Sequence, residues 1–400
     1  MLFRYLLPEN LRELFFDFFY ASSLAIANEV RLDIYQVRHC CAGPNFKCQY
    51  LFFEQRVLQV CAGAATTLIK VGLMHAMVLN RIGAPLQWTE LPEPQPGPGQ
   101  IRLKVTACGV CRTDLHVVDG ELPDPQLPII PGHEIVGRVD ALGAGVQGLS
   151  IGQRVGVPWL GHTCGTCAYC AAQQENLCDQ PAFTGFTLQG GFATSVIAYA
   201  DYVFALGEAL SDESLAPLLC AGLIGWRALR MGAEGQHVGL YGFGAAAHIL
   251  AQIVRWQGRS FYAFTRPGDQ ATQTFARQLG AEWAGDCDQL PPRPLDLAII
   301  FAPVGALVPL ALKAVRKGGR VVCAGIHMSD IPSFAYSLLW QERQLMSVAN
   351  LTRVDGQEFF RQVPQMGIVT HTHRYPLARA NEALADLRAG RFSGAAVLVP

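Results

Sequence analysis

The sequence has few charged residues and no tract of positive charge. Only 16% of its 400 residues are charged, and the formal net charge is -1. Proteins that bind nucleic acid or an anionic membrane through charge carry a basic patch or tract, so we expect neither partner. Internal repeats and low-complexity segments are also absent. The length predicts two or three globular domains with a large core.

The sequence also lacks an unbroken apolar stretch of about 18 residues, the length that crosses a membrane. Its first 73 residues hold only short bulky runs, and Ala25–Ala27 resembles a signal cleavage site. Pro8 and several charged residues interrupt the apolar region that a signal peptide requires. From Met74 or Met77 onward the pattern becomes orderly. We therefore expect the protein to start at one of these methionines, with residues 1–73 a start-site error or a non-essential extension.

Cysteine, by contrast, is abundant and clustered. The chain has 13 cysteines, and four of them follow the spacing C-x2-C-x2-C-x7-C, at Cys164, Cys167, Cys170 and Cys178. Disulfides between such close neighbours would close strained small loops, whereas four thiolates close a tetrahedral zinc site that holds a loop in shape. The spacing predicts a structural zinc site. A zinc–thiolate site in turn indicates a reducing, cytoplasmic compartment.

The order of strand and helix patterns divides the chain into segments. Residues 74–210 show short alternating runs between glycine-rich connections, which predict a β-rich domain with long loops. Residues 211–345 alternate apolar strands with helices, which predicts a parallel, doubly wound sheet and hence an α/β protein. Residues 346–400 lose this alternation, and we expect them to return to the first domain. Among the expected elements are helices over 216–231 and 249–257 and strands over 76–79, 237–241, 260–265, 297–301 and 320–324.

A glycine-rich turn follows the strand expected at 237–241. Gly242, Gly244 and Ala247 fit the pattern G-x-G-x-x-A at the start of a helix. The first glycine allows a tight turn, the second lets the backbone approach a pyrophosphate, and the small third residue lets helix and strand pack closely. The motif alone is weak and also occurs as a purely structural turn. Its position between strand and helix favours dinucleotide binding.

The end of the next strand indicates which nicotinamide cofactor is used. Sites that select NAD usually carry Asp or Glu there, bonded to the ribose hydroxyls. This sequence has Thr265 followed by Arg266. A hydroxyl and a guanidinium can hold a 2′-phosphate, so we favour NADP(H) slightly over NAD(H). The alternative is that Arg266 is a solvated surface charge and NAD(H) is used.

Three further residues of metal-binding type lie far apart in the sequence. Cys111, His133 and Cys220 are each unremarkable alone, since a buried cysteine usually acts as a small hydrophobe. Together they form the set of three protein ligands that leaves a fourth position for water or substrate at a catalytic zinc. Their surroundings read G-x-C-x-T-D-L-H, then G-H-E, then L-C-A-G, with the four-cysteine lobe and the G-x-G-x-x-A turn in the same order.

These motifs, from about Met77 to Pro400, resemble the zinc-dependent alcohol dehydrogenases of the medium-chain dehydrogenase/reductase superfamily. The resemblance implies a chaperonin-10-like catalytic domain and a Rossmann cofactor domain, with limits near 74–210 and 211–345 and a C-terminal return over 346–400. It implies two zinc ions per chain, one catalytic and one structural. It also implies a small alcohol or aldehyde as the substrate, and a homo-oligomer, either a dimer or a tetramer.

The resemblance assigns roles around the catalytic zinc residue by residue. Cys111, His133 and Cys220 should bind the metal. Asp114 should hold the other nitrogen of His133 and fix its tautomer. Glu134 should be a carboxylate beside the metal, and in some states a transient ligand.

The resemblance also implies how protons and cofactor are handled. Thr113 should bond the alcohol oxygen, and His116 should pass its proton to solvent through the cofactor ribose. The expected chemistry is hydride transfer from a zinc-bound alkoxide to the nicotinamide. Arg353, in the segment N-L-T-R, resembles an arginine that meets the cofactor pyrophosphate. Trp159 falls where the family has a bulky pocket wall, although a plain core aromatic explains it nearly as well.

Three alternatives stay open or are disfavoured. Cinnamyl-type aldehyde reductases and polyol dehydrogenases share the scaffold, and the cinnamyl type shares the two-cysteine, one-histidine ligand set. Zinc-free quinone reductases lack both metal motifs and are disfavoured. A non-catalytic nucleotide-binding relative would not need the complete set of Thr113, His116, Glu134 and the three ligands.

Overall fold

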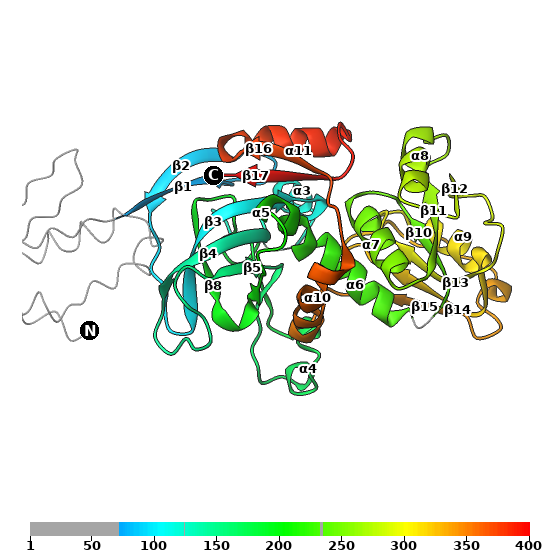
Figure 1. Cartoon of the computed structure of the whole chain (residues 1–400), viewed down its shortest axis with the longest axis horizontal. Coiled ribbons are helices and arrows are strands. Elements are labelled where there is room, and N and C mark those ends of the chain that lie inside the picture. Colours follow the sequence, from blue (N-terminus) through cyan, green and yellow to red (C-terminus); the bar gives the residue numbers. More distant parts are fainter. Residues whose placement is uncertain (1–71, 124, 233–234) are drawn as a thin grey trace, which may run out of the picture. The chain divides into compact units, whose positions relative to one another are not determined.

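A computed structural model describes residues 72–123, 125–232 and 235–400 (Figure 1). The expectation of an N-terminal extension concerns residues that lie almost wholly outside this part. Met74 and Met77 both fall in strand β1 (Leu73–Val78), which starts and ends slightly earlier than the strand expected at 76–79. It pairs antiparallel with β2 (Gln87–Pro92).

The first large sheet contains seven strands in the order β16-β17-β3-β4-β5-β9, with β8 paired to β3. The last strand of the chain, β17, pairs antiparallel with β3, so the C-terminal residues complete this sheet. The domain limits drawn from the sequence remain predictions. The strands are β3 (Gln100–Val110), β4 (Glu134–Leu142), β5 (Arg154–Val157), β8 (Ser195–Tyr199), β9 (Phe204–Ala205), β16 (Thr372–Pro376) and β17 (Ala395–Val399), and a separate pair is formed by β6 (Leu160–His162) and β7 (Ala182–Phe183).

Helices of different lengths lie along the segments that join and follow the strands of this first sheet. These α-helices are α3 (Arg112–Asp119), α4 (Ala168–Ala171), α5 (Asp212–Leu215), α10 (Arg353–Met366) and α11 (Ala380–Ala389). The 3-10 turns among the described residues are η2 (Glu175–Leu177), η3 (Ala200–Tyr202), η4 (Ala216–Leu219), η5 (Tyr336–Leu338) and η6 (Leu377–Arg379).

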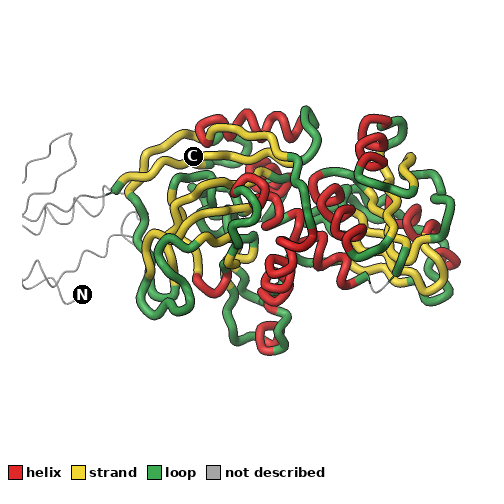
Figure 2. Tube along the Cα trace, viewed as in Figure 1, coloured by secondary structure: helices red, strands yellow, loops and turns green. Residues whose placement is uncertain are grey.

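The second sheet is six-stranded and fully parallel, in the order β12-β11-β10-β13-β14-β15. Figure 2 shows helices flanking its strands. Successive residues of one strand enter different cores: Leu240 joins the cluster with α6 and α7, and Tyr241 joins the cluster with α9. This is the doubly wound Rossmann arrangement that the sequence predicts. Its elements are α6 (Ala221–Met231), β10 (His237–Tyr241), α7 (Ala245–Trp256), β11 (Ser260–Thr265), α8 (Gln270–Gln278), β12 (Trp283–Asp286), β13 (Leu295–Ile300), α9 (Leu307–Ala314), β14 (Val315–Cys323) and β15 (Gln344–Ser347).

The chain crosses between the two sheets twice. The first crossing runs through η4 into α6, where the sequence predicts one helix over 216–231. The structure interrupts that helix at Cys220, whose φ of -124° and ψ of -70° are not helical. The second crossing joins β15 to α10. Ion pairs of Arg227 and Arg230 on α6 with Asp355 on α10 hold the two crossings together.

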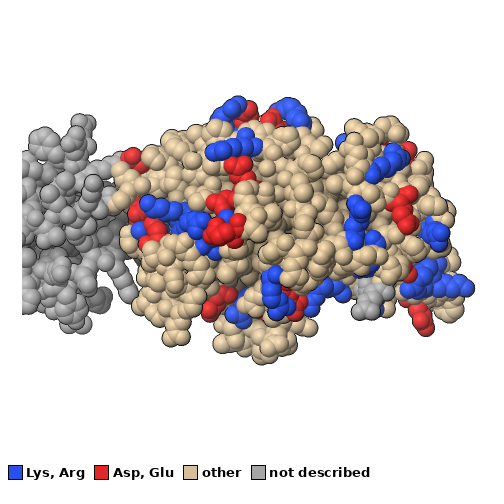
Figure 3. All heavy atoms as spheres, viewed as in Figure 1, with Lys and Arg blue, Asp and Glu red and all other residues tan. Residues whose placement is uncertain are grey.

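Helix α7 begins at Ala245, four residues before the start expected from the sequence, so its N-terminus opens directly on the glycine turn. No helix among the described residues has both the length and the apolar content needed to cross a membrane. Charged side chains of both signs are interspersed on the face shown in Figure 3.

One buried histidine lies under the glycine turn. His248 on α7 is 0% exposed, and in the described part of the chain neither of its ring nitrogens has a hydrogen-bond partner. The rings of Phe275 and His371 lie 6.1 and 6.0 Å away. Burial lowers the pKa of His248 to about 4, because the charged ring would lose its hydration there.

This histidine should make stability sensitive to acid. Between the ordinary histidine pKa of about 6.5 and the native value, the unfolded chain binds a proton that the native state does not, so stability falls as the pH falls. His248→Leu removes the titrating group. The free energy of unfolding of the variant, relative to that of wild type, should be roughly 2 kcal/mol higher at pH 5 than at pH 7. Denaturant unfolding at both pH values measures this difference. An unchanged difference between variant and wild type would contradict this, and the exposed His373→Leu serves as the matched control.

Candidate active site

Strand pairing brings two distant motifs to the same edge of the first sheet. Strand β3 ends at Val110, and Cys111 is the N-cap of α3. Strand β4 begins at Glu134, directly after His133. In the antiparallel register Gly109 faces Glu134, so the residues just beyond both strand ends meet. Cys220 reaches the same place from the interrupted helix of the first crossing.

Gly109 is required by how closely the strands approach there. A Cβ at this position would lie 1.7 Å from a carboxylate oxygen of Glu134 and 2.8 Å from its carboxyl carbon. Any side chain would therefore push the Glu134 carboxylate out of the site. The glycine that opens the first sequence motif makes room for the acid of the second.

Four potential donor atoms converge in this place. The Sγ of Cys111 lies 3.2 Å from the Nε2 of His133 and 3.9 Å from the Sγ of Cys220. With a carboxylate oxygen of Glu134, all donor atoms lie within 4.8 Å of one another. A tetrahedral zinc with bonds of about 2.0 to 2.3 Å places its ligand atoms roughly 3.3 to 3.8 Å apart. The geometry of the sulfur and nitrogen donors fits such an ion.

Asp114 holds the parts of this cluster together. Its Oδ2 accepts a hydrogen bond from the backbone N–H of Cys111 (2.8 Å), and its Oδ1 accepts from the N–H of Gly132 (3.2 Å). The same Oδ1 lies 3.0 Å from the Nδ1 of His133. Since an ionised carboxylate only accepts, the proton of His133 sits on Nδ1 and Nε2 is free to bind a metal. Burial alone would lower the pKa of His133, but the charges of Asp114 and Cys111 outweigh it and raise this pKa well above its usual value.

The cluster crowds acidic groups into a buried space. Burial raises the pKa of the Glu134 carboxyl well above its ordinary value, and the neighbouring Cys111 adds to the effect. The hydrogen bond shared with Cys220, together with burial, raises the pKa of Cys111. Burial contributes to both shifts, because an anion loses its hydration there. A bound divalent cation would supply compensating positive charge, so the donor set suits zinc.

The four cysteines of the predicted structural site also converge. The Sγ atom of Cys178 lies 3.5 Å from that of Cys164 and 3.9 Å from that of Cys167, and the Sγ atoms of Cys164 and Cys170 are 4.0 Å apart. All four sulfur atoms lie within 4.8 Å of one another, and none is in a disulfide. Bonded sulfurs would be about 2.05 Å apart. The spacing suits a closed tetrahedral thiolate site.

This four-cysteine lobe also braces the second crossing of the chain. The buried carboxylate of Glu175 accepts hydrogen bonds from the backbone N–H and the Nε of Arg353, at 2.8 and 3.3 Å. The side-chain amide of Asn176 donates to the carbonyl of Ala349 (2.8 Å). Arg353 also lies over the ring of Tyr202, 5.3 Å from its centroid.

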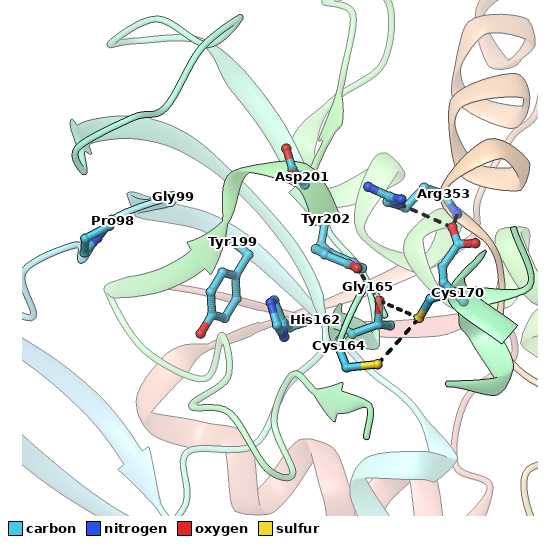
Figure 4. Close-up of a pocket in the computed structure, with 12 residues that line it drawn as sticks. Pro98, Gly99, His162, Cys164, Gly165, Cys170, Tyr199, Asp201, Tyr202 and Arg353 are labelled. Carbon is cyan, nitrogen blue, oxygen red and sulfur yellow. Dashed lines mark hydrogen bonds and ion pairs between the residues drawn. The ribbon is translucent and has the colours of Figure 1, made fainter. Parts of the chain in front are cut away.

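Arg353 contacts the four-cysteine lobe, and its suggested role at the cofactor pyrophosphate stays a prediction. Its contacts among the described residues are with the lobe, where it lines a cavity of about 450 Å³ together with Tyr202, His162 and Cys164 (Figure 4). No described contact joins it to Gly242 or to the rest of the glycine turn. Sequence similarity found the segment, but only the fold shows which partner the guanidinium takes.

The glycine turn itself has the shape expected of a dinucleotide site. Gly242 adopts a left-handed φ of +84°, and a Cβ there would lie 2.8 Å from the Cβ of Ala302. Gly244 caps α7 and has open space where its Cβ would be. Ala247 is fully buried against the sheet. The open side of Gly244 at a helix N-terminus fits a pyrophosphate.

Of the predicted pair, Arg266 is accessible to a ligand and Thr265 is buried. Thr265 is 3% exposed. Its hydroxyl lies 3.1 and 3.3 Å from the carbonyls of Arg266 and Gly285 and accepts from the Nε2 of Gln273 at 3.0 Å. The hydroxyl of Thr265 is therefore hydrogen-bonded within the protein, and its suggested part in holding a phosphate stays a prediction. The guanidinium of Arg266 is largely exposed and only loosely paired with Asp269, at 3.6 Å.

The proposed proton carriers lie on the first turns of α3. Thr113 donates its backbone N–H to the Sγ of Cys111 at 3.3 Å. His116 is 8% exposed, and its Nδ1 is hydrogen-bonded to the carboxylate of Glu121. The ring of His327, from the loop after β14, lies 5.6 Å from the ring of His116.

Sequence reasoning missed Glu121 and His327. Gly120 ends α3 in a left-handed conformation (φ +76°) and turns the chain back, which returns Glu121 to the helix. A glycine after a helix is a readable signal for such a reversal. His327 follows β14, and carboxyl ends of parallel strands meet at the edge where cofactors bind.

Trp159 lies at the catalytic cluster rather than in a remote part of the core. Its ring meets that of His133 edge-on, with centroids 5.1 Å apart. The other side of the indole is stacked on Phe183 and Phe186. The tryptophan thus forms an apolar wall beside a metal-ligand candidate.

Comparison with known proteins agrees with this architecture. The family model described as "Alcohol dehydrogenase GroES-like domain" matches residues 97–208. Over 338 residues the chain is 48% identical to the "Probable alcohol dehydrogenase AdhA" of Mycobacterium tuberculosis (strain CDC 1551 / Oshkosh), covering 82% of this chain and 97% of that protein. It is 33% identical to an alcohol dehydrogenase of Geobacillus stearothermophilus, covering 81% and 99%. The cobalt- and zinc-bound thermostable alcohol dehydrogenase from Pyrobaculum aerophilum matches with a TM-score of 0.75 at 25% identity, covering 82% of this chain and 100% of that one.

The fold and the convergent site define a nicotinamide-dependent oxidoreductase with a GroES-like and a Rossmann part. The chain belongs to the zinc-dependent alcohol dehydrogenase family of the medium-chain dehydrogenase/reductase superfamily. It interconverts alcohols with aldehydes or ketones by hydride transfer with a nicotinamide cofactor.

The contacts of Arg353 lead to a direct test. Arg353→Ala leaves buried Glu175 without its guanidinium partner, so the free energy of unfolding should fall by about 1 kcal/mol. Cofactor affinity, measured by fluorescence titration, should stay unchanged. A clear loss of cofactor affinity would instead favour the pyrophosphate role suggested by the sequence. Arg374→Ala, which breaks an exposed pair with Glu213, is the control.

Proposed function

We propose that the enzyme holds two zinc ions per chain. The catalytic one is bound by Cys111, His133 and Cys220, and the structural one by the four-cysteine lobe. The observation that carries this proposal is the convergence of three ligands from three separate segments into one buried place, with donor atoms within 4.8 Å. Three protein ligands leave one coordination position for substrate, as a catalytic zinc needs.

The residues around the ion divide the work. Bound zinc supplies Lewis-acid chemistry that lowers the pKa of an alcohol. Asp114 keeps the proton of His133 on Nδ1 and so fixes the ring as a ligand. Glu134 places a buried carboxyl group beside the three ligands. Thr113, two residues after Cys111, is placed to bond the substrate oxygen, and His116 carries the released proton toward solvent.

We also propose that NADP(H) is favoured slightly over NAD(H). No carboxylate stands at the end of β11, where NAD-selecting sites carry one. Arg266 is exposed at this point and free enough to meet a 2′-phosphate. The pyrophosphate would lie at Gly242, Gly244 and Ala247. An NADP-dependent cinnamyl-type aldehyde reductase is the second candidate, and the same exposed Arg266 favours it.

We also propose an oligomeric state, a location and a substrate class for the enzyme. A homo-oligomer, a dimer or a tetramer, follows from the family resemblance. A cytoplasmic location suits six cysteines held as metal-site thiols, because these survive best in a reducing compartment. Small alcohols and aldehydes are the proposed substrates, with the apolar wall of Trp159 limiting bulk near His133.

A steady-state assay tests the proposal as a whole. Purified protein is assayed with a panel of alcohols and aldehydes, with NAD(H) and NADP(H) in parallel, before and after treatment with a zinc chelator. Turnover that the chelator abolishes supports the catalytic zinc, and metal analysis should count two zincs per chain. Turnover insensitive to complete zinc removal would overturn the metal assignment.

Removal of a catalytic ligand should separate chemistry from cofactor binding. Cys111→Ala or His133→Ala should abolish turnover and lower the zinc content by about one ion per chain, while cofactor affinity remains. Cys287→Ser changes a cysteine outside both clusters and should leave all three measurements unchanged. Equal loss of turnover and cofactor affinity would argue that the cluster is structural.

Substitution of Arg266 tests the cofactor preference. Arg266→Ala should raise the KM for NADP(H) about tenfold, the equivalent of losing about 1.4 kcal/mol of charge-assisted binding. The KM for NAD(H) should stay within about twofold. Lys313→Ala, another exposed cation of the Rossmann domain, is the control. A wild-type enzyme that strongly prefers NAD(H) would overturn the preference outright.

A further inference from the structure

His116 is too buried to release a proton by itself. The residue is 8% exposed, and α3 packs Leu115 and Val117 beside it into the core. A ring that accepts a proton at one nitrogen must pass a proton on from the other before it can act again. The immediate question is therefore which group receives the proton from the far nitrogen.

The far nitrogen is held by a carboxylate that reaches solvent. The Nδ1 of His116 is hydrogen-bonded to an Oε of Glu121, and the Glu121 side chain is 47% exposed. The backbone geometry secures this pair. Gly120 reverses the chain, and the N–H of Glu121 then donates to the carbonyl of His116 at 2.9 Å. The carboxylate is thus fixed at the helix end with one side toward the ring and the other toward water.

We propose that Glu121 is a positioning residue for the reaction, and that the proton released by the reaction reaches water through its carboxylate. While ionised, Glu121 only accepts, so it keeps a proton on the Nδ1 of His116 and leaves Nε2 free as the base. When Nε2 takes up a proton, the ring passes its Nδ1 proton to the Glu121 carboxylate, which releases it to solvent. The inference rests on the proposed role of His116 as the proton carrier.

The step balances in atoms and electrons. Oxidation of an alcohol removes one hydride, which the nicotinamide accepts, and one proton, which leaves the hydroxyl group. That proton enters His116 at Nε2, a different proton leaves at Nδ1, and Glu121 returns to its carboxylate form once water has taken it. The ring is then protonated at Nε2, and before the next turnover it loses this proton to water and regains one at Nδ1 from water through Glu121, with no net change in protons. In the reduction direction the same groups supply the proton in reverse order. No oxidant or reductant beyond the nicotinamide is needed.

The other neighbour of His116 is less suited to this role. The His327 ring approaches from the loop after β14 at 5.6 Å between centroids and a tilt of 52°. Within the described ranges no hydrogen bond joins the two rings, whereas Glu121 bonds the ring nitrogen directly. Glu121 and His327 are the titratable groups that face His116 in the described contacts.

The test compares hydride transfer with proton release in a single turnover. Nicotinamide absorbance follows the first event, and a pH-indicator dye follows the second. Glu121→Ala should slow proton release about tenfold, a modest share of what a general acid–base group contributes, and added formate or acetate should restore the rate by filling the gap. Glu121→Gln keeps an acceptor oxygen toward Nδ1 but cannot accept a proton. In this variant the ring should stay in place while proton release stays slow. Neither variant should change zinc content or the melting temperature.

The controls make each outcome decisive. Glu90→Ala breaks another His–Glu pair on the surface, with His75 at 3.8 Å, and should leave both rates unchanged. Slowed turnover without carboxylate rescue, or full activity of Glu121→Gln, would overturn the proposal. Slower proton release in His327→Gln, with an unchanged rate in both Glu121 variants, would also overturn it. If His116→Ala were fully active, the proposed relay itself would be wrong, and absence of wild-type turnover would count against the proposed function alone.

Discussion

The catalytic site depends on one buried carboxylate, that of Asp114. It accepts hydrogen bonds from the N–H groups of Cys111 and Gly132 and from the ring of His133. These donors belong to two segments, the end of β3 and the residues before β4, which the β3–β4 pairing brings together. A carboxyl group that is 1% exposed requires such donors, because a buried polar group without hydrogen bonds is costly. Its three contacts therefore fix the start of α3, the loop before β4 and the ring of a metal-ligand candidate together.

The parts of the fold that local chemistry determines could be read from the sequence. The glycine turn, the parallel alternation and the four-cysteine spacing each need particular residues at particular distances along the chain, and the structure has the expected elements there. The interruption at Cys220 escaped prediction because residues 216–231 are mostly apolar, so their pattern predicts one helix although Pro217 and Gly222 lie close to the break. Periodicity cannot show that a single residue leaves the helix to reach a site built by other segments.

Side-chain partners were harder to foresee than backbone elements. Thr265 ends β11 as expected, yet its hydroxyl is engaged by Gln273 and by backbone carbonyls, which only the packing of α8 reveals. Arg353 was recognised by its segment, but its guanidinium meets Glu175, which is 178 residues earlier in the chain. Glu121 was overlooked because the chain reversal at Gly120 brings it to His116. Helical spacing does not predict this contact. In each case the partner of the side chain is set by packing or by a chain reversal, which local sequence patterns do not report.

The two crossings between the sheets are each anchored at a cysteine cluster. The first carries Cys220 into the catalytic cluster, and the second is held by Glu175 and Asn176 of the four-cysteine lobe. Both connections between the sheets are therefore tied to a group of potential metal ligands. Loss of the thiolates at either group would loosen a segment that joins the two sheets, as well as the group itself.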